Sequence, residues 1–301
     1  MAQLETEYEL EHPGRKAGAD LVGATSMRRH FLELLKTSWL LRIGCFIVAA
    51  ALFLTAFGPL VAPFDLEAST AEVLQPPSGK HWFGTDGSGF DVFSRVLAAP
   101  RIDVTIALAG TLLSLVVGSL VGLLASFFRG WAGELVMRSS DIVQAFPLFV
   151  LAIIFVTGRG RSVFNIIVVI ALLNVPIYLR LIRSEVLSLR ERLFVEAAKA
   201  SGASGLSIAL RHVLPNAMSP GFAQASITLG YSIIIAAGLS FIGAGIQPPT
   251  AEWGSMIAAG ANGIQIGEWW PSVFPGLAMA LTVFGFAIVG EALQTVVLRR
   301  T

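Results

Sequence analysis

Charged residues are scarce in this sequence. Asp, Glu, Lys and Arg make up 14% of its 301 residues, whereas hydrophobic residues make up 54%. A water-soluble domain of this length needs more charge to cover its surface, so the composition favours a chain embedded in a membrane. Positive charge is not in excess either, because the formal net charge is only +1, and this argues against a nucleic-acid partner. The single cysteine, Cys45, excludes an internal disulfide and is expected to pack as a small hydrophobic residue.

Signatures of catalysis are also missing. Gly79-Lys80 lacks both the upstream glycine and the following hydroxyl of a phosphate-binding G-x-x-x-x-G-K-[ST] loop, so ATP hydrolysis on this chain is not expected. The four histidines lie outside the apolar runs without metal-binding spacing, and no metal site is predicted. The string 202–205 matches the G-x-S-G of rhomboid-type intramembrane proteases. No apolar run supplies a histidine base, however, and chance in a glycine-rich turn explains the string better. We therefore do not expect an enzyme.

Long apolar runs are what the sequence does contain. Six of them come close to, or reach, the roughly 20 helical residues that cross a hydrocarbon core. They lie near Trp39–Phe57, Val104–Phe128, Ser139–Val156, Val163–Ile182, Phe222–Gly245 and Val273–Val297. The third is the least regular because Asp141, Gln144 and Pro147 interrupt it, an interruption that neighbouring helices can compensate. The prediction is an all-α membrane protein with six transmembrane helices.

The distribution of basic residues predicts the orientation. With both termini in the cytoplasm, sixteen of the 21 Lys and Arg residues fall on the cytoplasmic side, as the positive-inside rule requires. Residues 1–38 are then a cytoplasmic segment in which Arg28–Lys36 forms an amphipathic helix at the membrane interface. Residues 39–57 form the first span, 58–103 an extracytoplasmic segment, and 104–298 a core of five helices.

The longest cytoplasmic connection within that core spans residues 183–220. Its first half has apolar residues at helical spacing up to Ala200, and Gly202 follows where a helix C-terminal glycine turns the chain. Its second half places Leu206, Leu210, Val213 and Leu214 on one stripe, after which Pro215 is expected to end the helix. The pattern predicts two short amphipathic helices around a glycine bend.

This connection resembles the EAA loop of binding-protein-dependent ABC importer permeases. The resemblance is carried by Glu196-Ala197-Ala198, by Gly202 six residues after the glutamate, and by the run His212-Val213-Leu214-Pro215-Asn216. Three further stretches are similar to the branch of that family that transports dipeptides, oligopeptides or nickel. They are His81 to Arg95, Leu239 to Gly254, and Trp269 to Leu277. Phe90 departs from that branch, which has arginine at this position.

The resemblance implies a type I ABC importer. Two permease chains pair, here as a heterodimer, each permease receives an ATPase subunit or domain on its EAA loop, and an extracytoplasmic binding protein delivers the solute. ATP and magnesium would bind the ATPases, so no cofactor is expected on this chain. The implied location is the bacterial inner membrane, with the lipid bilayer as a further partner. The residues expected to couple to the ATPase are Arg192, Glu196, Ala197, Ala198, Lys199, Gly202, Leu206, Leu210, His212, Leu214, Pro215 and Asn216.

Two further sets of candidate site residues follow. The outer stretches suggest that Asp86, Asp91, Arg95 and Trp253 face the binding protein. Gln144, Asn174 and Gln224 are neutral polar residues within the spans, and they either line a pore or form hydrogen bonds between helices. Because ionisable groups are missing from the middle of the spans, an ion-coupled secondary carrier is the disfavoured alternative. A scaffold for a membrane complex is the alternative without transport.

Overall fold

The computed structural model describes residues 31–127 and 131–298. Residues 31–37 are helical, whereas the rest of the predicted N-terminal segment, including Arg28, lies outside the described residues. The elements that follow are α3 (Trp39–Val61), α4 (Val92–Ala98), α5 (Pro100–Phe127), α6 (Trp131–Ala145), α7 (Leu148–Arg159), α8 (Val163–Leu189), α9 (Leu193–Ala200), α10 (Gly205–Ile208), a π-helical turn (Ala209–Val213), α11 (Leu214–Phe241), α12 (Trp253–Gly260), a 3₁₀ helix (Ala261–Ile266) and α13 (Trp270–Leu298). The only extended pairing in the described part of the chain is an isolated bridge between Thr85 and Asp91.

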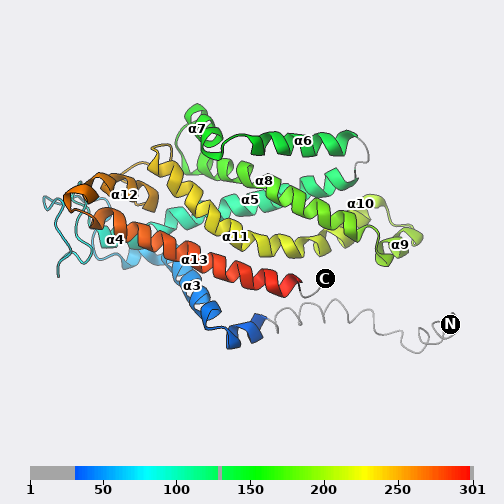
Figure 1. The fold of residues 1–301 in the computed structure, drawn as a ribbon, viewed down its shortest axis with the longest axis horizontal. Helices are drawn as coiled ribbons and strands as arrows, with labels where there is room; N and C mark the ends of the chain where they lie inside the picture. Colours follow the sequence, from blue (N-terminus) through cyan, green and yellow to red (C-terminus); the bar gives the residue numbers. More distant parts are fainter. Residues whose placement is uncertain (1–30, 128–130, 299–301) are drawn as a thin grey trace.

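The long helices form an elongated bundle (Figure 1). Among the described residues, five helices are long and apolar enough to cross a membrane, and α6 with α7 makes a sixth if the pair counts as one span. The prediction of an all-α membrane protein is thereby confirmed. In Figure 1, α9 and α10 lie at one end of the bundle and α4 and α12 at the other. We call these the α9 end and the α12 end.

The third predicted span is not a continuous helix, and this prediction is corrected. Its two halves, α6 and α7, are bent by 92° around Pro147. Proline has no N–H to donate within a helix, and its ring disfavours helical backbone at the preceding residue, here Phe146. The chain therefore leaves the helix at Phe146 and starts a new one in another direction at Leu148.

Close packing of α5 on α8 depends on small residues. A Cβ atom on Gly118 would lie 2.7 Å from the Tyr178 Cβ and 2.8 Å from the Val175 oxygen. A Cβ atom on Gly122 would lie 2.6 Å from the Leu179 oxygen. Because backbone atoms fill these positions, only glycine allows the two helices to approach so closely, as is typical of helix pairs in membranes.

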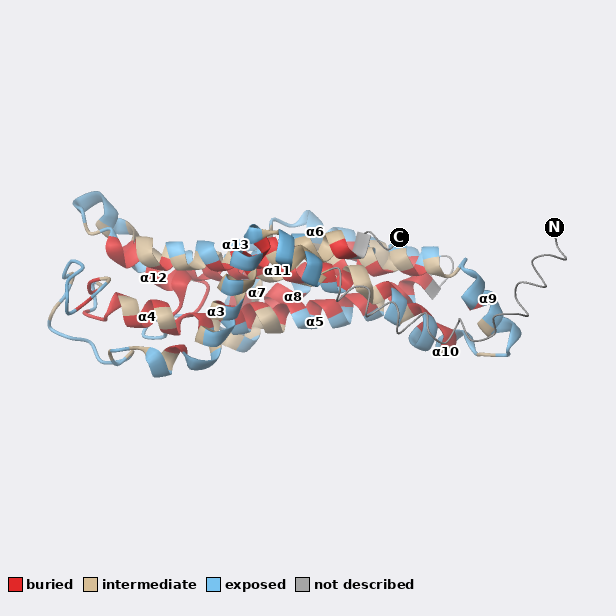
Figure 2. Cartoon of the chain, turned by 90° about the horizontal axis from the view of Figure 1, so that it is seen from below, coloured by how far each residue is buried: buried red, intermediate tan, exposed pale blue. Residues whose placement is uncertain are grey.

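Three helices also share a buried polar contact. The Asn174 side chain on α8 donates to the Ile170 carbonyl and, at 3.3 Å, to the Ser232 hydroxyl on α11. The Ser232 hydroxyl lies 3.3 Å from the Thr111 hydroxyl on α5. Each of these polar groups has a partner within the bundle, so the contact ties α5, α8 and α11 together without leaving an unpaired group. Buried residues follow the same three helices in Figure 2, whereas α9 is largely exposed.

Candidate functional sites

The connection between α8 and α11 forms a projecting loop at the α9 end of the bundle (Figure 1). Its helix α9 ends at Ala200, and Gly202 adopts a positive φ of 79°. Gly202 N–H donates to the Lys199 carbonyl at 3.0 Å, and Ala203 N–H donates to the Ala198 carbonyl at 3.1 Å. These two bonds define a Schellman turn, which satisfies the last carbonyls of α9 and reverses the chain. The helix, glycine bend and helix predicted within residues 183–220 are thus present, as α9, Gly202 and α10.

The apolar residues predicted to form one stripe on the second loop helix do not share one face. Val195, Ile208, Ala209 and Val213 face inward and pack with Leu123, Ile182 and Val186 of α5 and α8. Leu206 and Leu210, which the sequence pattern places on one stripe with Val213, are 63% and 44% exposed, whereas Val213 is buried. The π-helical turn at Ala209–Val213 explains why the stripe is broken, because the extra residue in this turn rotates the residues after it relative to Leu206.

The predicted end of the second loop helix at Pro215 is wrong. Pro215 occupies the first turn of α11, and the helical path continues without interruption from Gly205 to Phe241. Proline inside a regular α-helix clashes with the carbonyl four residues earlier, and the wider π-helical turn just before Pro215 relieves this conflict. The loop is therefore connected rigidly to the membrane helix α11.

The outer surface of the loop carries both apolar and charged groups. Leu193, Phe194, Leu206 and Leu210 are exposed. The twelve residues predicted to couple to an ATPase all belong to this loop or to the first turn of α11. Of these, the following are exposed: Arg192, Glu196, Ala197, Lys199, Gly202, Leu206, Leu210, His212, Pro215 and Asn216. Ala198 and Leu214 are half-buried beneath them. Apolar side chains ringed by charges are typical of a protein-docking surface.

At the α12 end, three residues expected to face a binding protein are buried instead. Asp91, Arg95 and Trp253 are 5%, 3% and 2% exposed. Asp91 caps α4 by accepting bonds from the Ser94 N–H and hydroxyl, both at 2.7 Å. The Trp253 N–H donates to Asp103 at 3.0 Å, which joins α12 to α5. These side chains hold the outer segment together, so the prediction that they are surface contacts is corrected.

Arg95 also explains what the phenylalanine at position 90 does. The Arg95 guanidinium donates to the Pro249 carbonyl at 3.0 Å and to the Thr250 carbonyl at 3.3 Å. Its central carbon lies 4.5 Å from the centre of the Phe90 ring. A cation over an aromatic face is attracted to it, so Phe90 supports the guanidinium that binds the segment before α12.

A second contact closes the outer segment around His81, which is 2% exposed. Its Nδ1 lies 2.8 Å from an Asp91 oxygen and its Nε2 lies 3.3 Å from a Glu72 oxygen. The Phe64 ring stacks on the imidazole at 4.7 Å. The hydrogen bond from Lys80 lowers the pKa of the exposed Glu72 carboxyl below its ordinary value.

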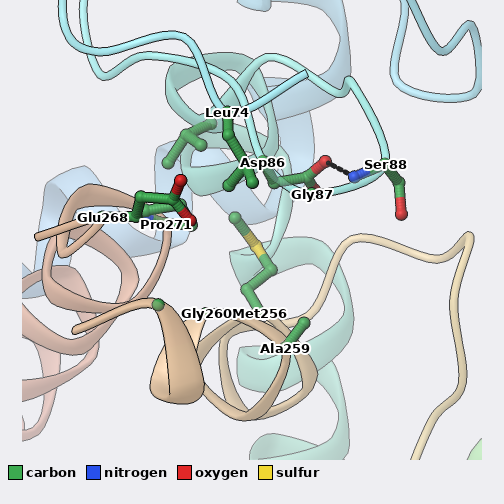
Figure 3. A pocket seen from close by; sticks show the side chains of 11 residues that line it. Leu74, Asp86, Gly87, Ser88, Met256, Ala259, Gly260, Glu268 and Pro271 are labelled. Carbon is green, nitrogen blue, oxygen red and sulfur yellow. Dashed lines mark hydrogen bonds between the residues drawn. The ribbon is translucent and has the colours of Figure 1, made fainter. Parts of the chain in front are cut away.

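Asp86, the fourth outer candidate, borders a pocket of about 240 Å³. Figure 3 shows Asp86 on the segment before α4 and Glu268 on the turn before α13, with Met256 of α12 between them. One Asp86 oxygen accepts bonds from the Ser88 and Phe90 N–H groups at 2.9 and 3.0 Å. Of the four outer candidates, only Asp86 keeps a partly exposed position.

The three pore candidates occupy different environments. Gln144 is exposed on α6. Asn174 is 1% exposed and bonded between helices as described above, so it does not line a pore in this structure. Gln224 is half-buried on α11, where its side-chain oxygen lies 3.5 Å from the Gln294 amide on α13.

The structure also pairs two charges that the sequence leaves separate. Arg180 Nη2 on α8 donates to an Asp141 oxygen on α6 at 2.7 Å. In the sequence, both residues appear only as isolated charges near the ends of spans. The two residues lie 39 positions apart in the sequence. Helical periodicity relates residues within one helix only, so it could not predict this contact between two helices.

Together these features define a multi-spanning all-α membrane protein with a projecting, partly apolar loop between two of its long helices. The chain belongs to the family described as the binding-protein-dependent transport system inner membrane component, whose family model matches residues 114–301.

Curated relatives cover most of the chain. The dipeptide transport system permease protein DppC of Alkalihalophilus pseudofirmus is 37% identical over 94% of this chain and 93% of its own length. The probable D,D-dipeptide transport system permease protein DdpC of Escherichia coli is 39% identical over 87% and 88%. The glutathione transport system permease protein GsiD of Pectobacterium atrosepticum is 36% identical over 82% and 84%. A solved inward-facing structure of the MetNI methionine ABC transporter shares the fold. Its TM-score is 0.50 at 19% identity, over 66% of this chain and 96% of that chain.

Proposed function

We propose that this chain is one permease subunit of an ATP-driven importer that moves a small peptide into a bacterial cell. The substrate class follows the names of the three relatives, two of which are dipeptide permeases and one a glutathione permease. Nickel, which the sequence resemblance left open, finds no support among these relatives and is not part of the proposal. In this proposal the chain spans the bacterial inner membrane. The α9 end faces the cytoplasm, and the α12 end faces the extracytoplasmic side.

The observation that carries this proposal is the exposed loop that contains α9 and α10. Neither Glu196 nor Lys199 has an ion-pair partner among the described residues, so both charges are free to meet another protein. The exposed Leu193, Leu206 and Leu210 add apolar area beside them. An ATPase that docks here would act on a rigid body, because α10 is continuous with α11.

The other proposed partners are a second permease chain and an external binding protein that delivers the peptide. The second permease is expected to co-purify with this chain. ATP and magnesium would bind the two ATPases, so this chain needs no cofactor of its own. The face of the α12 end is available for the binding protein through the pocket beside Asp86 and through exposed aromatic residues such as Trp82. Aromatic side chains are common anchors in protein interfaces.

The test is uptake of a labelled dipeptide into proteoliposomes that hold both permeases, both ATPases and the binding protein. Uptake is expected to require ATP and every component. Glu196→Ala is expected to reduce the uptake obtained per ATP hydrolysed, whereas Glu134→Gln on the bundle surface serves as the control and leaves it unchanged. Uptake that survives removal of the ATPases and stops when the proton gradient collapses would instead establish a secondary carrier.

A further inference from the structure

The ion pair between Asp141 and Arg180 lies on the surface of the chain rather than in its interior. The Asp141 and Arg180 side chains are 46% and 41% exposed, although their oxygen and nitrogen are only 2.7 Å apart. Arg138, one turn earlier on α6, approaches the second Asp141 oxygen at 3.7 Å. The pair therefore joins α6 to α8 while both charges stay accessible from one side.

The pair also lies at the border of a stretch without charged residues, both in α8 and in the broken span made of α6 and α7. Residues 163–179 of α8 contain no charged side chain, and Arg180 is the first one encountered from the α12 end. In the broken third span, Asp141 is the last charged residue before residues 142–158, which contain none. Arg183, the next charged residue of α8, follows one helical turn later, where its guanidinium donates to the Gly133 carbonyl at 3.4 Å. On α6 and α8, a solute travelling inward from the α12 end meets this pair before any other charged side chain.

Exposed charges on membrane-spanning helices rarely face lipid, because the hydrocarbon solvates them poorly. They face another protein chain or a water-filled path, and they commonly mark the route of a substrate. Gln144 lies three residues after Asp141, on the same side of α6 and also exposed. The side of α6 and α8 that carries these groups is therefore turned away from the bilayer.

We propose that Asp141 and Arg180 form a subsite on the translocation path that receives the two charged ends of a zwitterionic peptide. The Arg180 guanidinium takes the peptide carboxylate, for which its planar donors are suited, and the Asp141 carboxylate takes the peptide ammonium group. Exchange between the protein pair and the peptide leaves no charge unpaired at any stage, which avoids the large cost of an isolated charge away from water. This inference rests on the proposed function, since it assumes that the solute is a peptide.

The test compares free and capped dipeptides in the complete reconstituted transporter. The substrates are one dipeptide, its C-terminal amide and its N-acetyl derivative, each supplied at a concentration that saturates the isolated binding protein. Because a lost hydrogen bond to a charged group is costly, Arg180→Gln is expected to lower uptake of the free dipeptide roughly tenfold. The same variant should change uptake of the amide less than about twofold, because the amide has no carboxylate to lose. Asp141→Asn should show the same selectivity toward the N-acetyl derivative.

Equal proportional losses for free and capped peptides would show that the pair only clamps α6 to α8, and would overturn the subsite. Glu291→Gln is the matched control, since Glu291 is also an exposed carboxylate on a long helix but belongs to α13 rather than to α6 or α8. It should alter none of the ratios. If the wild-type transporter takes up no dipeptide at all, the proposed function fails, whereas unaffected variants in a working transporter refute the subsite alone.

A second measurement does not depend on capped peptides. Gln144→Cys is introduced into a Cys45→Ser chain, which removes the single native cysteine. A water-soluble methanethiosulfonate reagent is expected to label this cysteine in the assembled transporter, and transported dipeptide is expected to slow the labelling. A cysteine that never reacts in the working transporter would place this face outside the path and overturn the proposal.

Discussion

Replacing Gly202 isolates the contribution of one backbone angle to the proposed docking of an ATPase. Gly202 holds φ at 79°, and no atom lies within 4 Å of the position that a Cβ would occupy. A side chain therefore meets no steric obstacle, and the whole cost of a substitution comes from the left-handed backbone. That cost is roughly 1–2 kcal/mol for an ordinary residue, which corresponds to a factor of about 5–30 in the population of the native turn.

Valine and asparagine provide a matched comparison at this position. Asparagine tolerates the left-handed region and substitutes for glycine at helix ends, whereas a β-branched residue does not. We expect Gly202→Val to weaken ATPase binding by roughly 5- to 30-fold, and Gly202→Asn to stay close to wild type. The two hydrogen bonds of the turn, made by the Gly202 and Ala203 N–H groups, would be lost in the valine variant.

The assay measures the affinity of the purified permease pair for its ATPases, together with the peptide taken up per ATP hydrolysed. Membrane insertion, followed by the yield of correctly sized permease pair, should be the same for both variants because α9 and α10 lie at one end of the bundle (Figure 1). Identical behaviour of the valine and asparagine variants would refute the reasoning, because it would mean that the turn is not held by the backbone conformation of Gly202.

Three further outcomes can be checked. Gly118→Ala should lower the midpoint of thermal unfolding, since overpacking costs typically 1–3 kcal/mol. Gly276→Ala is the control and should leave the midpoint unchanged, because its Cβ would meet its nearest neighbour at 4.0 Å. Equal midpoints for the two variants would contradict the packing argument. Ser204→Cys in a Cys45→Ser chain should react only with reagents that reach the cytoplasm, and labelling from outside would reverse the proposed orientation. The lowered pKa of Glu72 means that its contribution to stability is present above the unfolded pKa of about 4.3 and is lost as the pH falls through the folded value. The difference in unfolding midpoint between wild type and Glu72→Gln should therefore vanish in acid, and a difference that persists there would argue against the charged contact.

Much of the fold was predictable because it depends on local composition. Apolar runs long enough to cross a membrane became helices, and the glycine at position 202 ended α9 in the expected turn. The stretches that resemble the permease family also predicted membership of that family, which no single side chain could do. The errors concern residues whose role depends on a distant partner. Asp91 and Arg95 have the composition of surface residues, yet they are buried because His81 and the backbone near Pro249 satisfy them.

Prolines produced two of the errors in helix boundaries, in opposite directions. Pro147 was expected to be tolerated inside one span, but the chain bends there by 92°. Pro215 was expected to end a helix, but a π-helical turn immediately before it lets the helix continue. Whether a proline breaks a helix depends on the packing around it and on the hydrogen bonds its neighbours find, and these are tertiary properties.

The sequence by itself determined that the chain is a membrane protein and where most of its apolar helices lie. It also determined the position of the loop centred on Gly202 between two of these helices. These properties follow from burial of apolar surface and from backbone preferences that act over a few residues. Only the tertiary structure decided which side of the loop is exposed, that Asp91 and Trp253 are structural, and that Asp141 meets Arg180 at 2.7 Å. Such contacts join residues far apart in the chain. They are set by how the helices pack, and no pattern within one helix records that packing.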